Sequence, residues 1–232
     1  MHLNFKEPIA VGVPIRSMKV APTDGLLHQA SPLLFSQEHL PEARSCMEEL
    51  TAEEWTSLNQ YRVRFNESQQ ARQALDMLAA SKDSPSYGFR VNNYRHSLQC
   101  ATMLYRDGAD EETVVCGLFH DLGFVVCPDN HGDFAAALLV NYISEKNHWM
   151  LRHHALFLDF HAGENPDLNH RARERYRGHP HFEYTAEWVA RYDQTAIQTQ
   201  YDTAPLEFFE PMVYRVFSRP SKGVKGFREP AS

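Results

Sequence analysis

The stretch NYRHSLQCATMLYRDGADEETVVCGLFHDLG, residues 93–123, decides the fold that this sequence predicts. Its apolar residues recur with helical spacing on both sides of Gly108. We therefore expect one helix over about 91–107, ended by Gly108, and a second over about 110–121, capped by Asp110. Polar residues at the end of so apolar a helix are unusual and need an explanation.

The rest of the chain has helical patterns as well. Thr51 and Glu54 have the spacing of a capping box, which predicts the start of a helix. Further helices are expected at about 51–65, 69–80, 131–143, 144–157, 168–177, 181–197 and 205–217. No run of alternating β-branched residues indicates a strand. The sequence predicts an all-α domain of eight or nine helices over 49–218, between an irregular arm at 1–48 and a tail at 219–232.

The composition is that of a globular protein in a reducing compartment. The chain has 232 residues, of which 43% are hydrophobic, and four cysteines that form no CxxC pair. We therefore expect free thiols and a cytoplasmic protein. The formal net charge of -7 argues against a nucleic-acid partner, and no apolar run approaches the roughly 20 residues that span a membrane. The oligomeric state is not predicted.

One basic run departs from this acidic balance, and we expect it to be part of a solvated tail. It comprises Arg215, Arg219, Lys222, Lys225 and Arg228.

Histidine is the unusual residue, with 13 in all and seven of them between His96 and His161. His120 and Asp121 end an apolar helix, where burial of polar side chains is costly unless they have partners. Imidazole and carboxylate are natural ligands for divalent iron, manganese or zinc. His96 on the preceding helix and Asp193 near the end of TAEWVARYDQ complete the pattern H…HD…D across three helices.

The order and spacing of these residues resemble those of the HD-domain superfamily, because His96 in HSLQCATML precedes His120 in HDLG by 24 residues. The resemblance covers about residues 85–218 and implies a helical bundle around a metal site. The ligands that it implies are His96, His120, Asp121 and Asp193. It further implies that Asp121, the residue expected at the catalytic centre, can bridge to a second ion.

Two further histidines resemble those of HD proteins that hold two metal ions. His131 opens a helix in NHGDFAAALL, and His154 lies in WMLRHHALF. The stretch MLRHHALFLDFH is similar to part of the myo-inositol oxygenases, and RYDQ and DTAPLEFFEPMV resemble a related bacterial branch that includes phosphonate-cleaving diiron oxygenases. His153 adjoins His154, and the sequence leaves open an exchange of their roles.

This branch implies a mixed-valence Fe(II)/Fe(III) oxygenase. Dioxygen would be the co-substrate for C–H abstraction and for oxidative cleavage or oxygenation of a small organic molecule. The alternative is a metal-dependent phosphohydrolase of the same superfamily, with Mn or Zn activating water. Phe124 follows HDLG where many relatives carry a substrate-binding Lys or His, which favours the oxygenase and a less anionic substrate. A non-catalytic partner protein is the third hypothesis.

Five more residues are expected near the substrate or behind the ligands. Gln99 lies one turn after His96, and either orients a ligand by a hydrogen bond or packs within its helix. His153 is expected behind the ligands or at the surface. The other expected positions are Tyr87, Phe124 and Arg152. Three arginines, Arg90, Arg95 and Arg152, could still bind an anion.

Overall fold

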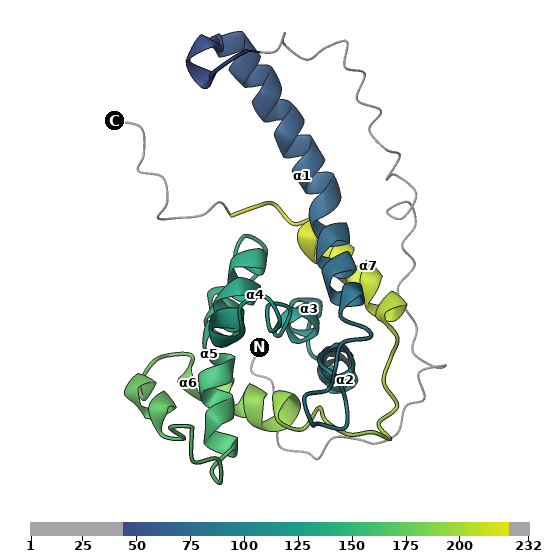
Figure 1. Cartoon of the computed structure of the whole chain (residues 1–232), viewed down its shortest axis with the longest axis vertical. Coiled ribbons are helices and arrows are strands. Elements are labelled where there is room, and N and C mark those ends of the chain that lie inside the picture. Colours follow the sequence, from purple (N-terminus) through teal and green to yellow (C-terminus); the bar gives the residue numbers. More distant parts are fainter. Residues whose placement is uncertain (1–43, 223–232) are drawn as a thin grey trace.

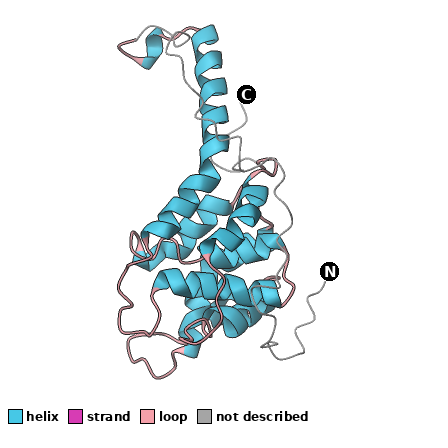
Figure 2. Cartoon of the chain, turned by 90° about the vertical axis from the view of Figure 1, so that its right-hand side faces the viewer, coloured by secondary structure: helices cyan, strands magenta, loops and turns pink. Residues whose placement is uncertain are grey.

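The structure, a computed structural model, describes residues 44–222, and every regular element in that range is helical (Figures 1 and 2). The α-helices are α1 (Ala52–Ala80), α2 (Asn93–Arg106), α3 (Glu111–Phe119), α4 (His131–Leu139), α5 (Glu145–Leu158), α6 (Phe182–Trp188) and α7 (Leu206–Phe217). Short 3-10 turns are η3 (Met47–Glu49), η4 (Pro128–Asn130), η5 (Asp159–His161) and η6 (Ala172–Tyr176), and η7 (Val189–Asp193) is a π-helical turn. The all-α prediction is confirmed for these residues. Most of the expected arm, residues 1–43, and the end of the expected tail, residues 223–232, lie outside the described residues.

The described part holds seven α-helices rather than eight or nine, for two reasons. The helices expected at 51–65 and 69–80 are one helix, α1, because residues 66–68 contain no Gly or Pro that would end it. The helix expected at 168–177 is only the 3-10 turn η6.

The predicted capping box at the start of α1 is confirmed. The Thr51 hydroxyl accepts a hydrogen bond from the Glu54 backbone N–H, and the Glu54 carboxylate accepts one from the Thr51 N–H. The buried residues of α1 are Ala71, Ala74, Leu75 and Leu78, all in its C-terminal half. This half packs against α7, while the N-terminal half extends beyond the bundle (Figure 2).

The bundle consists of helix pairs around one apolar core. α2 packs along α3, α4 packs along α5, and α7 lies against both α1 and α3 (Figure 1). Two glycines permit the closest approaches. A Cβ on Gly117 of α3 would lie 2.4 Å from a Leu104 side-chain carbon of α2, and a Cβ on Gly132 of α4 would lie 2.7 Å from the Leu151 carbonyl oxygen of α5. Both glycines are close in sequence to candidate ligands.

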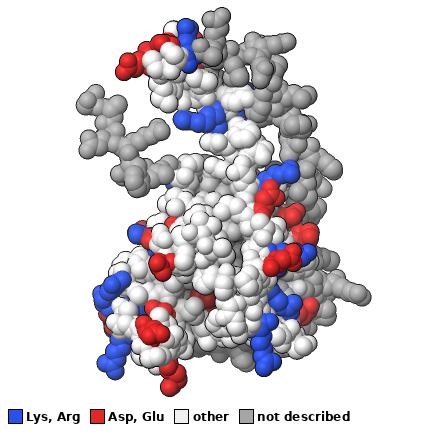
Figure 3. All heavy atoms as spheres, viewed as in Figure 1, with Lys and Arg blue, Asp and Glu red and all other residues white. Residues whose placement is uncertain are grey.

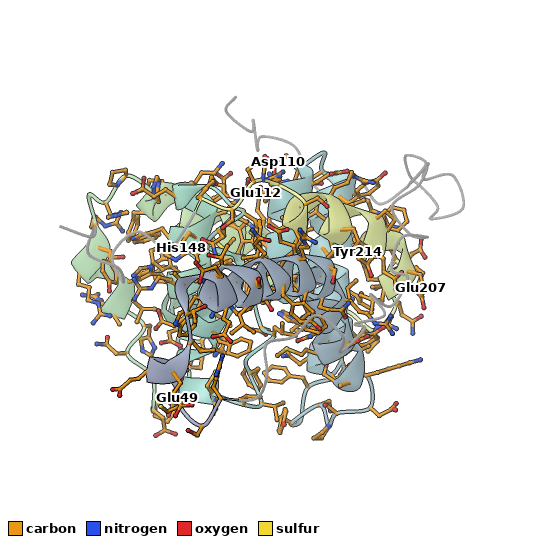
Figure 4. The ribbon with its side chains drawn as sticks, turned by 90° about the horizontal axis from the view of Figure 1, so that it is seen from above. Glu49, Asp110, Glu112, His148, Glu207 and Tyr214 are labelled. Carbon is orange, nitrogen blue, oxygen red and sulfur yellow. The ribbon has the colours of Figure 1, made fainter. Side chains whose placement is uncertain are left out.

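The described part of the basic run forms surface ion pairs, and its residues Arg219 and Lys222 are exposed to solvent as expected. Arg215 forms an ion pair with Glu111 at 2.6 Å, and Arg219 forms one with Glu112 at 2.7 Å. The backbone N–H of Lys222 donates to the Asn141 carbonyl at 3.1 Å. The two ion pairs fasten the end of α7 to the start of α3, where Figure 4 labels Asp110 and Glu112, and the Lys222 bond reaches the residues after α4. Lys225 and Arg228 lie outside the described residues.

The described surface mixes both signs of charge. On the face shown in Figure 3, Lys and Arg side chains alternate with Asp and Glu side chains around an uncharged centre. None of the helices within residues 44–222 has both the length and the apolar character of a membrane span. All four cysteines are free thiols, with Cys100 and Cys116 buried.

Candidate metal centre

The fold brings together the six residues that the sequence singled out as ligands. They come from four helices and one turn: His96 of α2, His120 and Asp121 at the end of α3, His131 of α4, His154 of α5, and Asp193 of η7. Their side-chain nitrogen and oxygen atoms form two neighbouring sets, which share one carboxylate.

The first set, which we term the inner group, comprises His96, His120 and Asp193. The Nε2 atoms of His96 and His120 lie 3.0 Å apart. The Asp193 Oδ1 atom lies 3.3 Å from the first of these nitrogens and 3.6 Å from the second. The Oδ2 atom of Asp121 completes the group, at 3.5 and 3.6 Å from the same two nitrogens.

The second set, which we term the outer pair, comprises His131 and His154. Their Nε2 atoms lie 3.1 Å apart. The Oδ1 atom of Asp121 lies 3.3 Å from the His131 nitrogen and 3.2 Å from the His154 nitrogen. The two oxygens of one carboxylate therefore face two different sets of imidazoles.

A backbone carbonyl fixes the orientation of each of the four rings. His120, His131 and His154 each donate Nδ1–H to the carbonyl oxygen three residues earlier in the chain, at 2.7–2.8 Å. His96 donates to the more distant Ala196 carbonyl at 3.1 Å. Because a carbonyl oxygen only accepts, the proton of each neutral ring lies on Nδ1, and the Nε2 lone pair faces the centre.

Lone pairs that face one another at about 3 Å are stabilised by a cation between them, which can be a shared proton or a metal ion. Two ligands that each lie about 2.1 Å from one ion are about 3.0 Å apart at a right angle and about 3.4 Å apart at the tetrahedral angle. The donor distances of 3.0–3.6 Å in both sets are close to these values. The donor atoms are thus close enough together to be ligands of a metal ion.

The burial of Asp193 gives independent support for a bound cation. Its residue is 1% exposed, and its Oδ2 atom is buried without a hydrogen-bond partner. An uncompensated buried carboxylate oxygen is costly, and a metal ion is one of the few groups that compensate it.

The pKa values show how strongly the carboxylates act on the inner group. Burial alone would lower the pKa of His96 and His120, but Asp121 and Asp193 outweigh burial and raise both values. Burial raises the pKa of Asp121, yet the imidazoles of His120, His154 and His96 bring it well below the usual range. In the outer pair, burial lowers the pKa of His131, and Asp121 offsets this only in part.

The π-helical turn η7 sets the direction of Asp193. The helix expected over 181–197 is α-helical only to Trp188, and the Gln194 N–H then bonds to the Val189 carbonyl, five residues earlier, at 3.1 Å. Such turns hold one more residue than an α-turn and are frequent at functional sites. The extra residue changes the face of the helix from which Asp193 projects.

Gln99 and His153 lie behind or beside the centre. The Gln99 amide is buried and makes two hydrogen bonds to the Gln198 backbone, at 2.7 and 2.8 Å. It therefore fastens the segment that carries the Ala196 carbonyl, and orients His96 through that segment rather than by direct contact. His153 donates Nδ1–H to the Trp149 carbonyl and stacks on the Trp149 ring at 4.2 Å.

Of the three other residues expected near the substrate, two lie beside the candidate ligands and one does not. The Phe124 ring lies 5.5 Å from the His131 ring, and the Tyr87 ring lies 5.9 Å from Phe124. Arg152 instead forms an ion pair with Asp133 at 2.6 Å and is about half exposed, and it contacts no ligand. Arg152 is thus not among the residues that the fold brings to the centre.

Sequence reasoning missed three contacts of the centre. The Asn93 side chain donates to the Asp121 carbonyl at 3.1 Å, and the Trp188 ring lies 5.5 Å from the His120 ring. The Ala196 carbonyl holds His96. Asn93 precedes His96 by three residues on α2, a spacing that could have indicated it, whereas a backbone carbonyl has no sequence signal.

No protein-family model matches this chain, and no curated protein is significantly similar to it in sequence. The centre is therefore defined by its geometry: buried His and Asp groups that could hold a metal ion.

Proposed function

We propose that this chain is a dinuclear metal enzyme of the HD-domain type, with one ion in the inner group and one at the outer pair. The observation that carries the proposal is the position of Asp121, whose two oxygens face the two sets of nitrogens at 3.2–3.6 Å. A carboxylate so placed can bridge two cations. A core histidine cluster without a metal would leave four lone pairs opposed.

We further propose that the metal is iron and that the enzyme is a mixed-valence diiron oxygenase. The donor set is nitrogen and oxygen without thiolate, which suits iron, and the resemblance in sequence to diiron oxygenases supports this choice over manganese or zinc. The chemistry that a bound iron pair would supply is the reduction of dioxygen coupled to oxidation of a C–H bond of a small organic substrate.

The protein groups contribute orientation, charge and access. The carbonyl partners hold all four imidazoles in one tautomer, so the site is organised before an ion binds. The inner group supplies the charge of Asp193, whereas the outer pair adds no carboxylate of its own. Fewer protein ligands at the outer pair leave positions for substrate and dioxygen.

The first test is metal content and gas uptake. The protein is loaded with Fe(II) without oxygen, and iron per chain is measured, followed by EPR spectra after partial oxidation. Two irons per chain and a coupled mixed-valence signal are expected, and oxygen uptake should begin with a suitable substrate. One ion per chain would refute the dinuclear centre. Phosphate release from phosphomonoesters without oxygen uptake would instead indicate the hydrolase.

A further inference from the structure

Among residues 44–222, three ligands of the candidate metal centre are partly exposed and three are buried. The side chains of His96, Asp121 and His131 are 10–13% exposed, whereas those of His120, His154 and Asp193 are 0–1% exposed. We refer to these three partly exposed ligands as the edge of the centre, because within the described residues a molecule can contact them first. The residues beside that edge determine which molecules can do so.

Aromatic rings border this edge on the side of the outer pair. Phe124 lies edge-on to His131 at 5.5 Å between ring centroids, and Tyr87 follows at 5.9 Å from Phe124. We refer to Tyr87 and Phe124 as the aromatic rim. The neighbouring positions are apolar and exposed as well, with Phe89 at 63% and Val126 at 73%. Exposed apolar side chains grouped beside a site are a common sign of ligand binding.

The backbone at Tyr87 is strained. Its φ of 51° makes it the one non-glycine residue with positive φ among residues 44–222, and Gly88 follows at 95°. Glycine would adopt this conformation without the steric cost that Tyr87 incurs. Strained residues in such regions cluster at ligand-binding positions, and the strained residue here is one of the two aromatic rings of the rim.

Two of the three arginines that could meet an anion, Arg152 and Arg95, already have partners. Arg152 is paired with Asp133 at 2.6 Å. Arg95 donates to the carbonyl of Thr199 at 3.0 Å and to that of Tyr201 at 3.4 Å. The side chains of the rim beside the outer pair are aromatic, and Arg90, an exposed residue that follows Phe89, is the arginine to test as an anion site.

We infer that the substrate is an uncharged small molecule whose apolar ring lies against Phe124 and Tyr87 while a polar group points to the outer pair. This inference rests on the proposed dinuclear centre. It assigns Phe124 and Tyr87 as the residues that determine specificity, and it excludes phosphorylated substrates. Ring-on-ring contact and burial of one aromatic face supply the selectivity.

The test uses the full chain loaded with redox-inert Zn(II) and three probes: 1-phenylethane-1,2-diol, ethane-1,2-diol and phenylphosphonate. Saturation-transfer NMR and titration calorimetry measure their binding. We expect the phenyl diol to bind at least about tenfold more tightly than either other probe. Phe124→Ala should abolish that difference, and Phe65→Ala, another exposed aromatic residue, should not change it.

Two further variants separate a binding role from a structural one. Tyr87→Gly should raise the unfolding temperature, because it relieves the strained φ, and should still weaken phenyl diol binding severalfold. Phe124→Lys should reverse the preference towards phenylphosphonate. Arg90→Ala should leave the affinities for all three probes unchanged, because the inference assigns Arg90 no role in binding an anion.

Several results would overturn the inference. Tighter binding of phenylphosphonate by the unaltered protein would do so, as would unchanged binding in Phe124→Ala. A change in oligomeric state on substitution of the rim, seen by size-exclusion chromatography, would make the rim a protein contact instead. A measured stoichiometry of one metal per chain would refute the dinuclear function, independently of which probe binds.

Discussion

The inner group and the outer pair share one carboxylate but differ in charge. The inner group adds the buried Asp193, and Asp121 and Asp193 raise the pKa of its two imidazoles. The outer pair has no second carboxylate, and burial lowers the pKa of His131. If the proposed dinuclear centre is correct, the inner group is the set suited to firm retention of an ion, and the outer pair is the set suited to an ion that also accepts substrate.

Loss of the shared carboxylate should have the largest effect. Asp121→Asn keeps the shape of the side chain but removes the negative charge that faces both sets, so both ions should bind at least about a hundredfold more weakly. Metal content after dialysis against a chelator measures this. Retention of two ions would show that Asp121 does not bridge.

Loss of one ligand of the outer pair should remove the outer ion and leave the inner ion bound. His154→Ala should reduce the stoichiometry from two ions to one, because the inner group keeps its three ligands and Asp121. The adjacent His153→Ala is the matched control and should keep two ions, since His153 stacks on Trp149 instead. Loss of both ions in His154→Ala would contradict the independence of the inner group.

Gln99→Met should weaken the inner ion selectively. It removes the two hydrogen bonds that fasten the Gln198 backbone, and with them the support of the carbonyl that orients His96. We expect about a tenfold loss of affinity at the inner group and little change at the outer pair. Chelator competition with Co(II) spectra distinguishes the two ions. Equal weakening of both, in step with the free energy of unfolding, would indicate only a structural role.

Gly132→Ala should affect the outer pair through its two helices. The added methyl group would lie 2.7 Å from the Leu151 carbonyl, which orients His154, so α4 and α5 must separate. We expect a loss of about 1–3 kcal/mol in the free energy of unfolding, with weaker binding of the outer ion. Gly163→Ala, where no atom lies within 4 Å, is the neutral control in denaturant titrations.

Acid should weaken the attachment of α3 to the start of α5 only slightly. Burial raises the pKa of Glu112, but hydrogen bonds from Ser144 and Asn147 and the contact with Arg219 outweigh burial and lower it below 4.5. These bonds tie α3 to the start of α5. Their contribution, about 1 kcal/mol, is present above pH 4.5 and is lost as pH falls through the lowered value. Glu112→Gln should remove this part of the pH dependence of unfolding, and an unchanged profile would contradict it.

The parts of the fold that depend on local patterns could be predicted from the sequence. Capping residues and apolar spacing indicated most of the helices, and the order of histidines and aspartates indicated which residues would meet. What could not be predicted depends on tertiary contact. The π turn before Asp193 has no residue signature, and the partner of Gln99 lies 99 residues further along the chain. The ion pair between Arg152 and Asp133 likewise depends on how α4 packs against α5.

The orienting carbonyls imply an order in which the centre forms during folding. His120, His131 and His154 take their direction from a carbonyl three residues back, so each is aligned as soon as its own turn forms. His96 is oriented only after the chain brings it to the Ala196 carbonyl, which lies 100 residues further along the sequence. Closing so long a loop is among the slower steps of chain assembly. A nascent chain would thus present a competent outer pair first, and the arrival of residues 196–198 would complete the inner group last.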